Sequence, residues 1–152
     1  MNLNLDLLKQ SGKLEISESD GKKWVYDIIR KKPIVLLPEE LVRQCIIWYL
    51  VDEKGVSKNL ISVERGIKVN GLFRRCDLIL YDRNILPYMI IEVKRPGQAI
   101  TQKVFNQIAM YNIPLRVPYL MVSNGIDNYA CHLNFEKKSF AFIDYIPAPE
   151  KF

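Results

Sequence analysis

The stretch from Glu64 to Lys94 decides the fold, and it reads ERGIKVNGLFRRCDLILYDRNILPYMIIEVK. Its residues follow a period of two, which predicts strands rather than helices. Asn70-Gly71 interrupts this pattern, and because both residue types tolerate positive φ, the pair predicts a two-residue hairpin turn. A looser turn is expected at 82–87. We therefore predict three antiparallel strands over residues 61–69, 72–81 and 87–95.

The positions of the two turns predict which residues face one another. If the Asn-Gly pair forms the first loop, Glu64 lies opposite Asp77. If the second turn is centred in its loop, the same count puts Glu92 opposite Asp77, although a bulge in that loop would change it. Lys94 is two residues past Glu92 and shares its face. We expect one face of this meander to pack in the core and the other to carry three acids in a row.

A row of carboxylates needs a positive charge among them, because like charges opposite one another on a sheet repel and raise each other's pKa. Lys94 can supply part of that charge, and a divalent cation would supply more. Oxygen ligands without histidine or thiolate favour Mg²⁺ or Mn²⁺ over zinc. Such a cation takes water and phosphate oxygens as its remaining ligands. The pattern therefore predicts a phosphodiester-cleaving metal site, with Lys94 orienting the water or stabilising the developing charge.

A plainer interpretation of Glu92-Val-Lys94 is a surface ion pair, which is common on strands. The predicted neighbour Asp77 argues against it. So does the apolar run 88–91 before Glu92, which is unusual for an exposed edge.

The rest of the chain surrounds this meander with helices and further strands. A helix is expected to begin at Pro38, with acids in its first turn, and to end at Lys54-Gly55. A second helix is expected over 99–113, before Pro114. Strands are expected at 23–30, 118–123, 129–134 and 139–144. The order predicts a sandwich-like α/β domain with a mixed β-sheet over 22–145, a loosely attached lead-in at 1–21 and a non-core tail at 146–152.

Composition excludes several classes of protein. With 152 residues, 49% hydrophobic and 26% charged, the chain has the size and make-up of one globular domain. Cys45, Cys76 and Cys131 have no C-x-x-C spacing, and His132 is the single histidine, which argues against zinc ribbons and histidine-based sites. The polar N-terminus and the lack of a long apolar run predict a soluble cytoplasmic protein. The net charge of +5 is compatible with a polyanionic partner.

Further candidates lie outside the meander. Gln107 and Tyr111 are spaced i, i+4, so they share one face of the second helix and could hydrogen-bond the site or a nucleic-acid backbone; an ordinary helix surface is the alternative. Glu40 either complements the helix dipole or reaches the metal site. Candidate phosphate contacts, with scattered surface cations as the alternative, are Lys68, Arg74, Arg75, Arg95 and Lys103.

The order of these residues resembles a known family. Glu64, Asp77 and Glu92-Val-Lys94, followed by Gln107-x-x-x-Tyr111, resemble the PD-(D/E)xK nuclease superfamily. The closer resemblance is to the N-terminal nuclease domain of the R subunit of type I restriction enzymes. It covers about residues 33–145 and includes PEELVR at 38–43, EVKRP at 92–96 and PYLMVSNG at 118–125.

This resemblance implies a restriction-endonuclease-like fold, in which a central mixed β-sheet is flanked by helices, and Mg²⁺-dependent hydrolysis of DNA. It further implies a role for each matching residue: metal ligands at Asp77, Glu92 and the Val93 carbonyl, a catalytic lysine at Lys94, a helper acid at Glu64 that also belongs to the metal site, and an accessory pair at Gln107 and Tyr111.

Two features depart from the family pattern. Cys76 stands where the superfamily has proline, a position that varies. The chain also has no G-x-x-x-x-G-K-[ST] loop and therefore no ATP-driven motor. A domain of this kind acts differently from a type I enzyme, recruits partners or is one piece of a system.

We therefore expect a metal-dependent endonuclease acting on DNA in restriction or genome defence, with other restriction-system subunits or a second copy as further partners. Two alternatives stay open. One is a DNA-binding or subunit-docking module whose catalysis is weak or lost, and the other is a nuclease for RNA or branched DNA.

Overall fold

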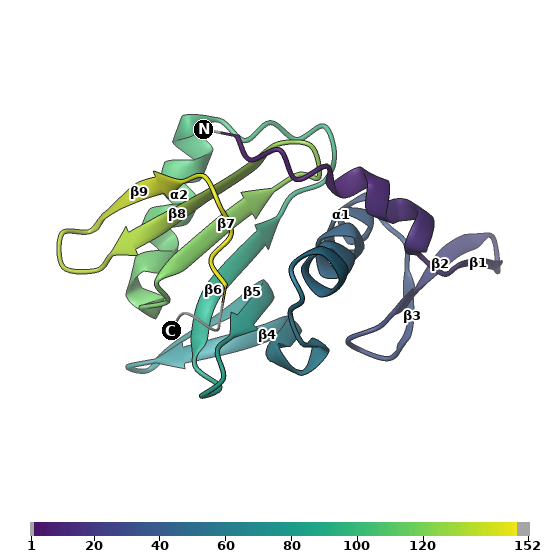
Figure 1. Cartoon of the computed structure of the whole chain (residues 1–152), viewed down its shortest axis with the longest axis horizontal. Helices are drawn as coiled ribbons and strands as arrows, with labels where there is room; N and C mark the ends of the chain where they lie inside the picture. The colour runs from purple at the N-terminus through teal and green to yellow at the C-terminus, as the bar shows by residue number, and fades with distance from the viewer. Residues whose placement is uncertain (1, 149–152) are drawn as a thin grey trace.

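The computed structural model describes residues 2–148, which form two sheets and two main helices in a mixed α/β arrangement (Figure 1). The smaller sheet has the order β1 (Ile16–Ser19), β2 (Lys22–Asp27), β3 (Lys32–Val35). The larger sheet has the order β4 (Ile61–Val69), β5 (Leu72–Tyr81), β6 (Pro87–Val93), β7 (Tyr119–Ser123), β8 (Asn128–Asn134), β9 (Ser139–Ile143). The helices are α1 (Pro38–Trp48) and α2 (Gln102–Asn112), and the short helical turns are η1 (Leu7–Lys13), η2 (Tyr49–Glu53), η3 (Lys58–Leu60) and η4 (Ile113–Leu115).

The larger sheet is mixed, as predicted. Strands β6 and β7 run parallel, and each other neighbouring pair in the sheet is antiparallel. The predicted meander is β4–β5–β6, although β6 ends at Val93, two residues earlier than expected. The three-stranded sheet β1–β3 was not predicted as a separate sheet. Within the described residues, none of the helices has the length and apolar character needed to cross a membrane.

The first hairpin has the predicted turn. Asn70 and Gly71 have φ angles of 49° and 80°, so both lie in the left-handed region that a type I′ turn requires. Val69 pairs with Leu72, and the same register continues past residue 64 on both sides. Glu64 therefore stands opposite Asp77, as predicted.

The second hairpin brings β6 beside β5 in the predicted register. Leu78 pairs with Ile91, so the next position along places Asp77 opposite Glu92. The backbone N–H of Val93 donates a 2.7 Å hydrogen bond to Asp77 Oδ2, which ties the two strands at this point. A bulge between Leu80 and Tyr81 absorbs the irregular turn without changing the register at the acids.

The central part of the larger sheet is buried on both faces, so the expectation of one core face and one acidic face is wrong. Ile79 and Ile90 lie on the expected acidic face, and both are fully buried in a core that includes Phe105 of α2. The cause is the parallel β6–β7 pair, because its crossover connection lays α2 across that face. The acids lie where this covered region ends.

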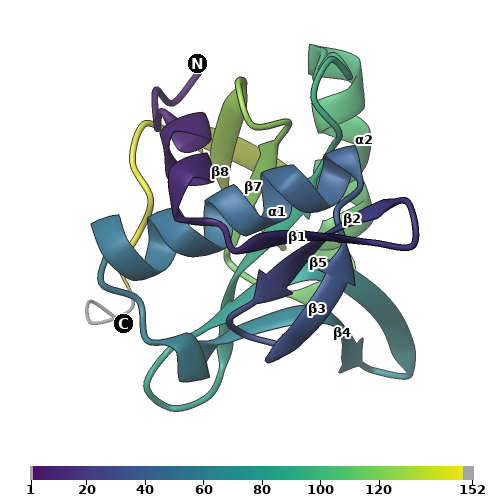
Figure 2. The same cartoon turned by 90° about the vertical axis from the view of Figure 1, so that its right-hand side faces the viewer.

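Helix α1 covers the opposite face and separates the two sheets (Figures 1 and 2). Val42, Ile46 and Ile47 are buried in the core on that side. The helix begins at Pro38 and continues as one π-helical turn to Glu53, close to its predicted end.

Both ends of the described chain contribute to the core. Leu3 and Leu7 are buried, and the Leu3 N–H donates to the Asn128 carbonyl. The lead-in is therefore part of the core rather than loosely attached to it, while the predicted domain boundaries stay a prediction. Ile146 in the predicted tail is also buried. The rest of that tail, residues 149–152, lies outside the described residues.

Candidate functional site

Asp77 on β5 is held between the sheet and α1. Its Oδ2 accepts the Val93 N–H at 2.7 Å, and its Oδ1 lies 3.4 Å from Nη2 of Arg43. It lines a cleft of about 540 Å³ between β3, the start of α1 and β4. A carboxylate has about four acceptor positions, so these two contacts leave Asp77 able to accept from a further ligand.

Glu92 and Lys94 lie together at the end of β6. Lys94 Nζ donates to Glu92 Oε1 at 3.2 Å, and the Lys94 backbone N–H donates to the Ser123 carbonyl on β7. Burial raises the pKa of Glu92 above its usual value; Lys94 opposes this shift, and the charge of Asp77 adds to it. The ionised form of Glu92 is therefore disfavoured by its surroundings, and an additional cation would stabilise it.

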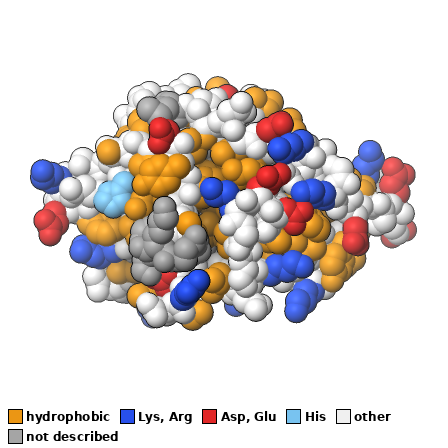
Figure 3. Space-filling model, viewed as in Figure 1, with side chains coloured by type: hydrophobic (Ala, Val, Ile, Leu, Met, Phe, Trp, Pro, Cys, Tyr) orange, Lys and Arg blue, Asp and Glu red, His pale blue; other side chains and the backbone are white. Residues whose placement is uncertain are grey.

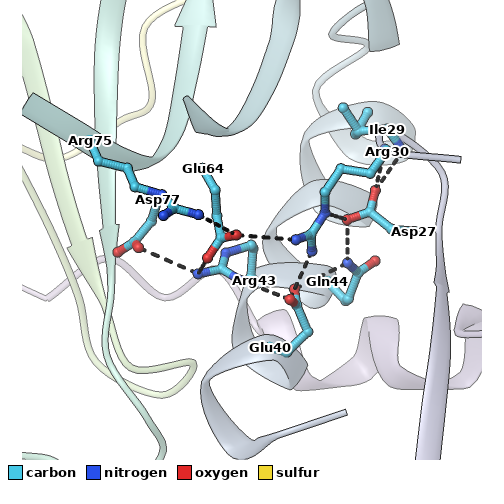
Figure 4. A network of polar contacts seen from close by, with 9 residues as sticks. All are labelled: Asp27, Ile29, Arg30, Glu40, Arg43, Gln44, Glu64, Arg75 and Asp77. Carbon is cyan, nitrogen blue, oxygen red and sulfur yellow. Dashed lines mark hydrogen bonds and ion pairs between the residues drawn. The ribbon is translucent and has the colours of Figure 1, made fainter. Parts of the chain in front are cut away.

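Glu64 on β4 points into a cluster of arginines rather than toward Glu92 and Lys94. Its φ of 52° is left-handed, a conformation that costs a non-glycine residue about 1 kcal/mol or more. Its carboxylate lies 3.0 Å from Arg75, 3.5 Å from Arg30 and 3.6 Å from Arg43 (Figure 4). Arg43 therefore contacts both Glu64 and Asp77.

Glu40 and its two arginine partners form a largely buried network that was not predicted from the sequence. The Oε1 atom of Glu40 accepts hydrogen bonds from Arg43 Nη1 and Arg30 Nη2, each at 2.8 Å (Figure 4). Glu40 is therefore more than a partner of the helix dipole, because Arg43 links it to Asp77. One signal was available: Glu40 and Arg43 are an i, i+3 pair in the first turns of the predicted helix.

Asp27 anchors the other end of this network. It accepts hydrogen bonds from Arg30 Nε at 2.7 Å, from Gln44 Nε2 at 2.9 Å and from the backbone N–H of Ile29 at 2.7 Å. Burial alone would raise the pKa of Asp27, but these hydrogen bonds, those from Arg30 foremost, hold it below its usual value. Arg30 is correspondingly held charged: burial lowers its pKa, and the contacts with Glu40 and Asp27 more than compensate.

The protein itself supplies much of the positive charge that the acids require. The sequence predicts that Lys94 and a divalent cation supply this charge. In the structure, Arg30, Arg43 and Arg75 surround Glu64, and Arg43 also lies beside Asp77. Across residues 2–148, no group of three or more His, Cys, Asp or Glu side chains is arranged to hold a metal ion. The carboxylates that remain for a cation are Asp77 and Glu92, and two carboxylates suit Mg²⁺ that keeps water or phosphate ligands.

Gln107 and Tyr111 lie on the outer surface of α2. Both are exposed, Tyr111 with 59% of its surface. No hydrogen bond or ion pair within the described chain joins either of them to Asp77, Glu92 or Lys94. Instead, the Arg74 guanidinium stacks on Tyr111, with its Cζ 3.3 Å from the ring centroid.

The five basic residues predicted to contact phosphates differ in their surroundings. Arg75 forms an ion pair with Glu64, and Arg74 stacks on α2. The other three, Lys68, Arg95 and Lys103, are exposed. Among the five, Arg75 alone makes an ion pair with a site acid in the part of the chain that the structure describes.

Comparison with known proteins places this arrangement in a family. A search of curated proteins found no match. Residues 38–147 match the family model described as type I restriction enzyme R protein N terminus. The matched region runs from the start of α1 past the end of β9 and contains Glu64, Asp77, Glu92 and Lys94. Since this match covers well over half of the chain, the protein belongs to the family of type I restriction enzyme R protein N-terminal domains.

Proposed function

We propose that this chain is a Mg²⁺- or Mn²⁺-dependent endonuclease that hydrolyses DNA within a restriction system, with a PD-(D/E)xK site on a restriction-endonuclease-like fold. One observation carries the proposal: the strand register brings Asp77, Glu92 and Lys94 together. Asp77 is tied to the strand of Glu92 through the Val93 N–H, and Lys94 contacts Glu92 directly. The membership in a restriction-enzyme family supports DNA as the substrate.

Asp77, Glu92 and the Val93 carbonyl are the groups that would hold the metal. When bound, the metal acidifies a water molecule and offsets charge on the attacked phosphate. The raised pKa of Glu92 fits a carboxylate whose ionised form a bound cation would stabilise. Lys94 Nζ, placed beside Glu92, donates to the attacking water or to a phosphate oxygen as charge develops.

Glu64 and Arg43 act as positioning residues in this proposal. Arg43 contacts Asp77, Glu64 and Glu40, so it sets the position of Asp77 relative to α1. Glu64 has the role of helper acid. It contacts Arg43, which also contacts Asp77, so Glu64 acts on Asp77 through this arginine. Gln107 and Tyr111, both exposed on α2, are proposed to contact the nucleic-acid backbone rather than the metal.

A second candidate function is a binding or subunit-docking module in the same restriction system. The observation that favours it is the Arg43–Asp77 contact, because a guanidinium already occupies one side of the acid that would bind metal. The two candidates differ in whether the wild-type protein binds Mg²⁺ or Mn²⁺.

The test is cleavage of plasmid and linear DNA with Mg²⁺, Mn²⁺ or EDTA. We expect nicking or cutting with metal and none with EDTA. Lys94→Met should lower the rate about 100- to 1000-fold, a typical loss for one group that stabilises transition-state charge. Asp77→Asn should abolish cleavage.

Two exposed residues provide matched controls, Lys137→Met for Lys94 and Asp20→Asn for Asp77. Both controls should cleave like the wild type. Full activity in both site variants would refute the site. Calorimetry that shows DNA binding but no metal uptake by the wild type would favour the binding module instead.

A further inference from the structure

A second groove, of about 710 Å³, is lined by Glu64 and Arg75 and, among the described residues, not by Asp77. Its walls are the β2–β3 turn, the η3 turn and the facing residues of β4 and β5. Six cations line it: Arg30, Lys31, Lys32, Lys58, Arg65 and Arg75. Glu64 is the one carboxylate among the described residues that line it.

Within residues 2–148, four of these cations have no acidic partner. Glu64 pairs with Arg30 and Arg75, but none of Lys31, Lys32, Lys58 and Arg65 forms an ion pair with a residue of the described chain. All four are exposed. Elsewhere the charges are mixed. Acidic and basic side chains lie side by side on the face shown in Figure 3, and the ion pairs Lys9–Glu53 and Lys13–Asp52 join η1 to η2. A concave surface whose charges are mostly positive concentrates a positive potential.

The groove also offers neutral hydrogen-bonding groups. Ser62 and Tyr81 line it, and their hydroxyls lie 3.3 Å from each other. Hydroxyls and basic side chains are the groups that contact phosphate and sugar in nucleic-acid complexes. The cations come from three segments that are far apart in sequence, so folding is what brings them together.

The basic groove adjoins the cleft that holds Asp77. Arg30, Lys32 and Glu64 line both hollows. Glu64 would repel a phosphate backbone, but three arginines offset its charge. We propose that this groove binds the sugar–phosphate backbone of DNA and leads it past Glu64 to Asp77 and Glu92. The direction of that path rests on the proposed function, whereas binding in the groove does not.

The experiment measures binding of a fluorescein-labelled DNA duplex to the full chain by fluorescence anisotropy, in EDTA so that no cleavage occurs. Lys58→Glu/Arg65→Glu reverses two groove charges. Lys137→Glu/Lys138→Glu makes the same charge change at the β8–β9 turn, away from the groove. Lys58→Gln/Arg65→Gln removes the groove charges without adding acids.

We expect the groove reversal to raise the Kd at least about tenfold and the control pair to change it less than about twofold. The slope of log Kd against log salt should fall by about two units in the neutral groove pair, because each lost phosphate contact removes about one. All these residues are exposed, so circular dichroism melts should match the wild type.

Equal losses in the groove and control pairs would show a general charge effect and overturn the proposal. Unchanged DNA binding in the two Lys58/Arg65 variants would overturn it as well. An acidic protein would then be the partner that fits the basic groove. A different result would show that the nuclease proposal alone fails. In that case DNA binding would depend on Lys58 and Arg65, but the wild type would not cleave DNA with either metal. If the wild type cuts and the groove pairs bind normally, the groove proposal fails alone.

Discussion

Arg43 Nη2, on α1, lies 3.4 Å from Oδ1 of Asp77, on β5. The guanidinium is almost completely buried, with 6% of its side chain exposed, and its Nε has no hydrogen-bond partner in the described chain. This contact joins the helix to the candidate site. Its removal would leave Asp77, Glu64 and Glu40 with less compensating charge.

The variant Arg43→Met tests that role. We expect a loss of about 3 kcal/mol in the free energy of unfolding, because breaking one side of a buried ion pair leaves its partner charged and unpaired. Urea unfolding at pH 7 measures it. Mg²⁺ should raise the melting temperature of this variant more than that of the wild type, because a bound cation would replace the lost charge.

Arg75→Met is the matched control, since Arg75 also pairs with Glu64 but is mostly exposed. It should lose no more than about 1 kcal/mol. Equal losses at the two positions would mean that burial of Arg43 has no energetic consequence.

Glu92→Gln should stabilise the metal-free fold at neutral pH. The pKa of Glu92 is raised in the folded state, chiefly by burial, so its ionised form opposes folding. Glu92 therefore contributes favourably to the stability of the fold below its ordinary pKa of 4.5. This contribution is lost as the pH rises through the higher pKa that Glu92 has in the folded state. Thermal melts in EDTA from pH 3.5 to 8 should show the variant above the wild type at pH 7 and level with it at the acidic end. A variant that is less stable at pH 7 would contradict this account.

Asp27→Asn should have the opposite pH dependence. The pKa of Asp27 is lowered in the folded state despite burial, because Arg30, Gln44 and Ile29 donate to it. Its stabilising effect is present above its ordinary pKa of 3.8 and is lost as the pH falls through the lower folded value. We expect a loss of about 2 kcal/mol at pH 7, typical of hydrogen bonds to a charged group. Denaturant unfolding should show this loss shrinking toward pH 3, and the exposed Asp20→Asn should show none.

Phe105→Ala should destabilise the α2 side of the core by about 3–5 kcal/mol. Phe105 is 2% exposed, and its ring contacts those of Tyr129, Phe140 and Phe142. Truncation would leave a cavity among these rings that the sheet cannot close. Denaturant unfolding measures the loss, with Phe73→Ala as the control because Phe73 is mostly exposed. Similar losses at both positions would contradict this view of the core.

Much of the candidate site could be predicted because it depends on local chemistry. Asn70-Gly71 specified its turn, and the turn set the register that puts Glu64 opposite Asp77. The same reasoning placed Glu92 opposite Asp77, and the bulge that could have changed the count lies beyond the acids. Strand alternation predicted wrongly that one face of the meander is exposed. Helix α2 covers that face, and the strand sequences do not encode where this helix packs.

The sequence by itself determined the meander, its register and the meeting of Asp77, Glu92 and Lys94, since turns and alternation act over a few residues. Only the tertiary structure decided that Arg43 lies beside Asp77, that Glu64 belongs to an arginine cluster, and that six cations share one groove. Arg43 and Asp77 are 34 residues apart. Their contact exists because burying the apolar face of α1 brings that helix across the sheet, and no pattern local to either residue encodes where it lands.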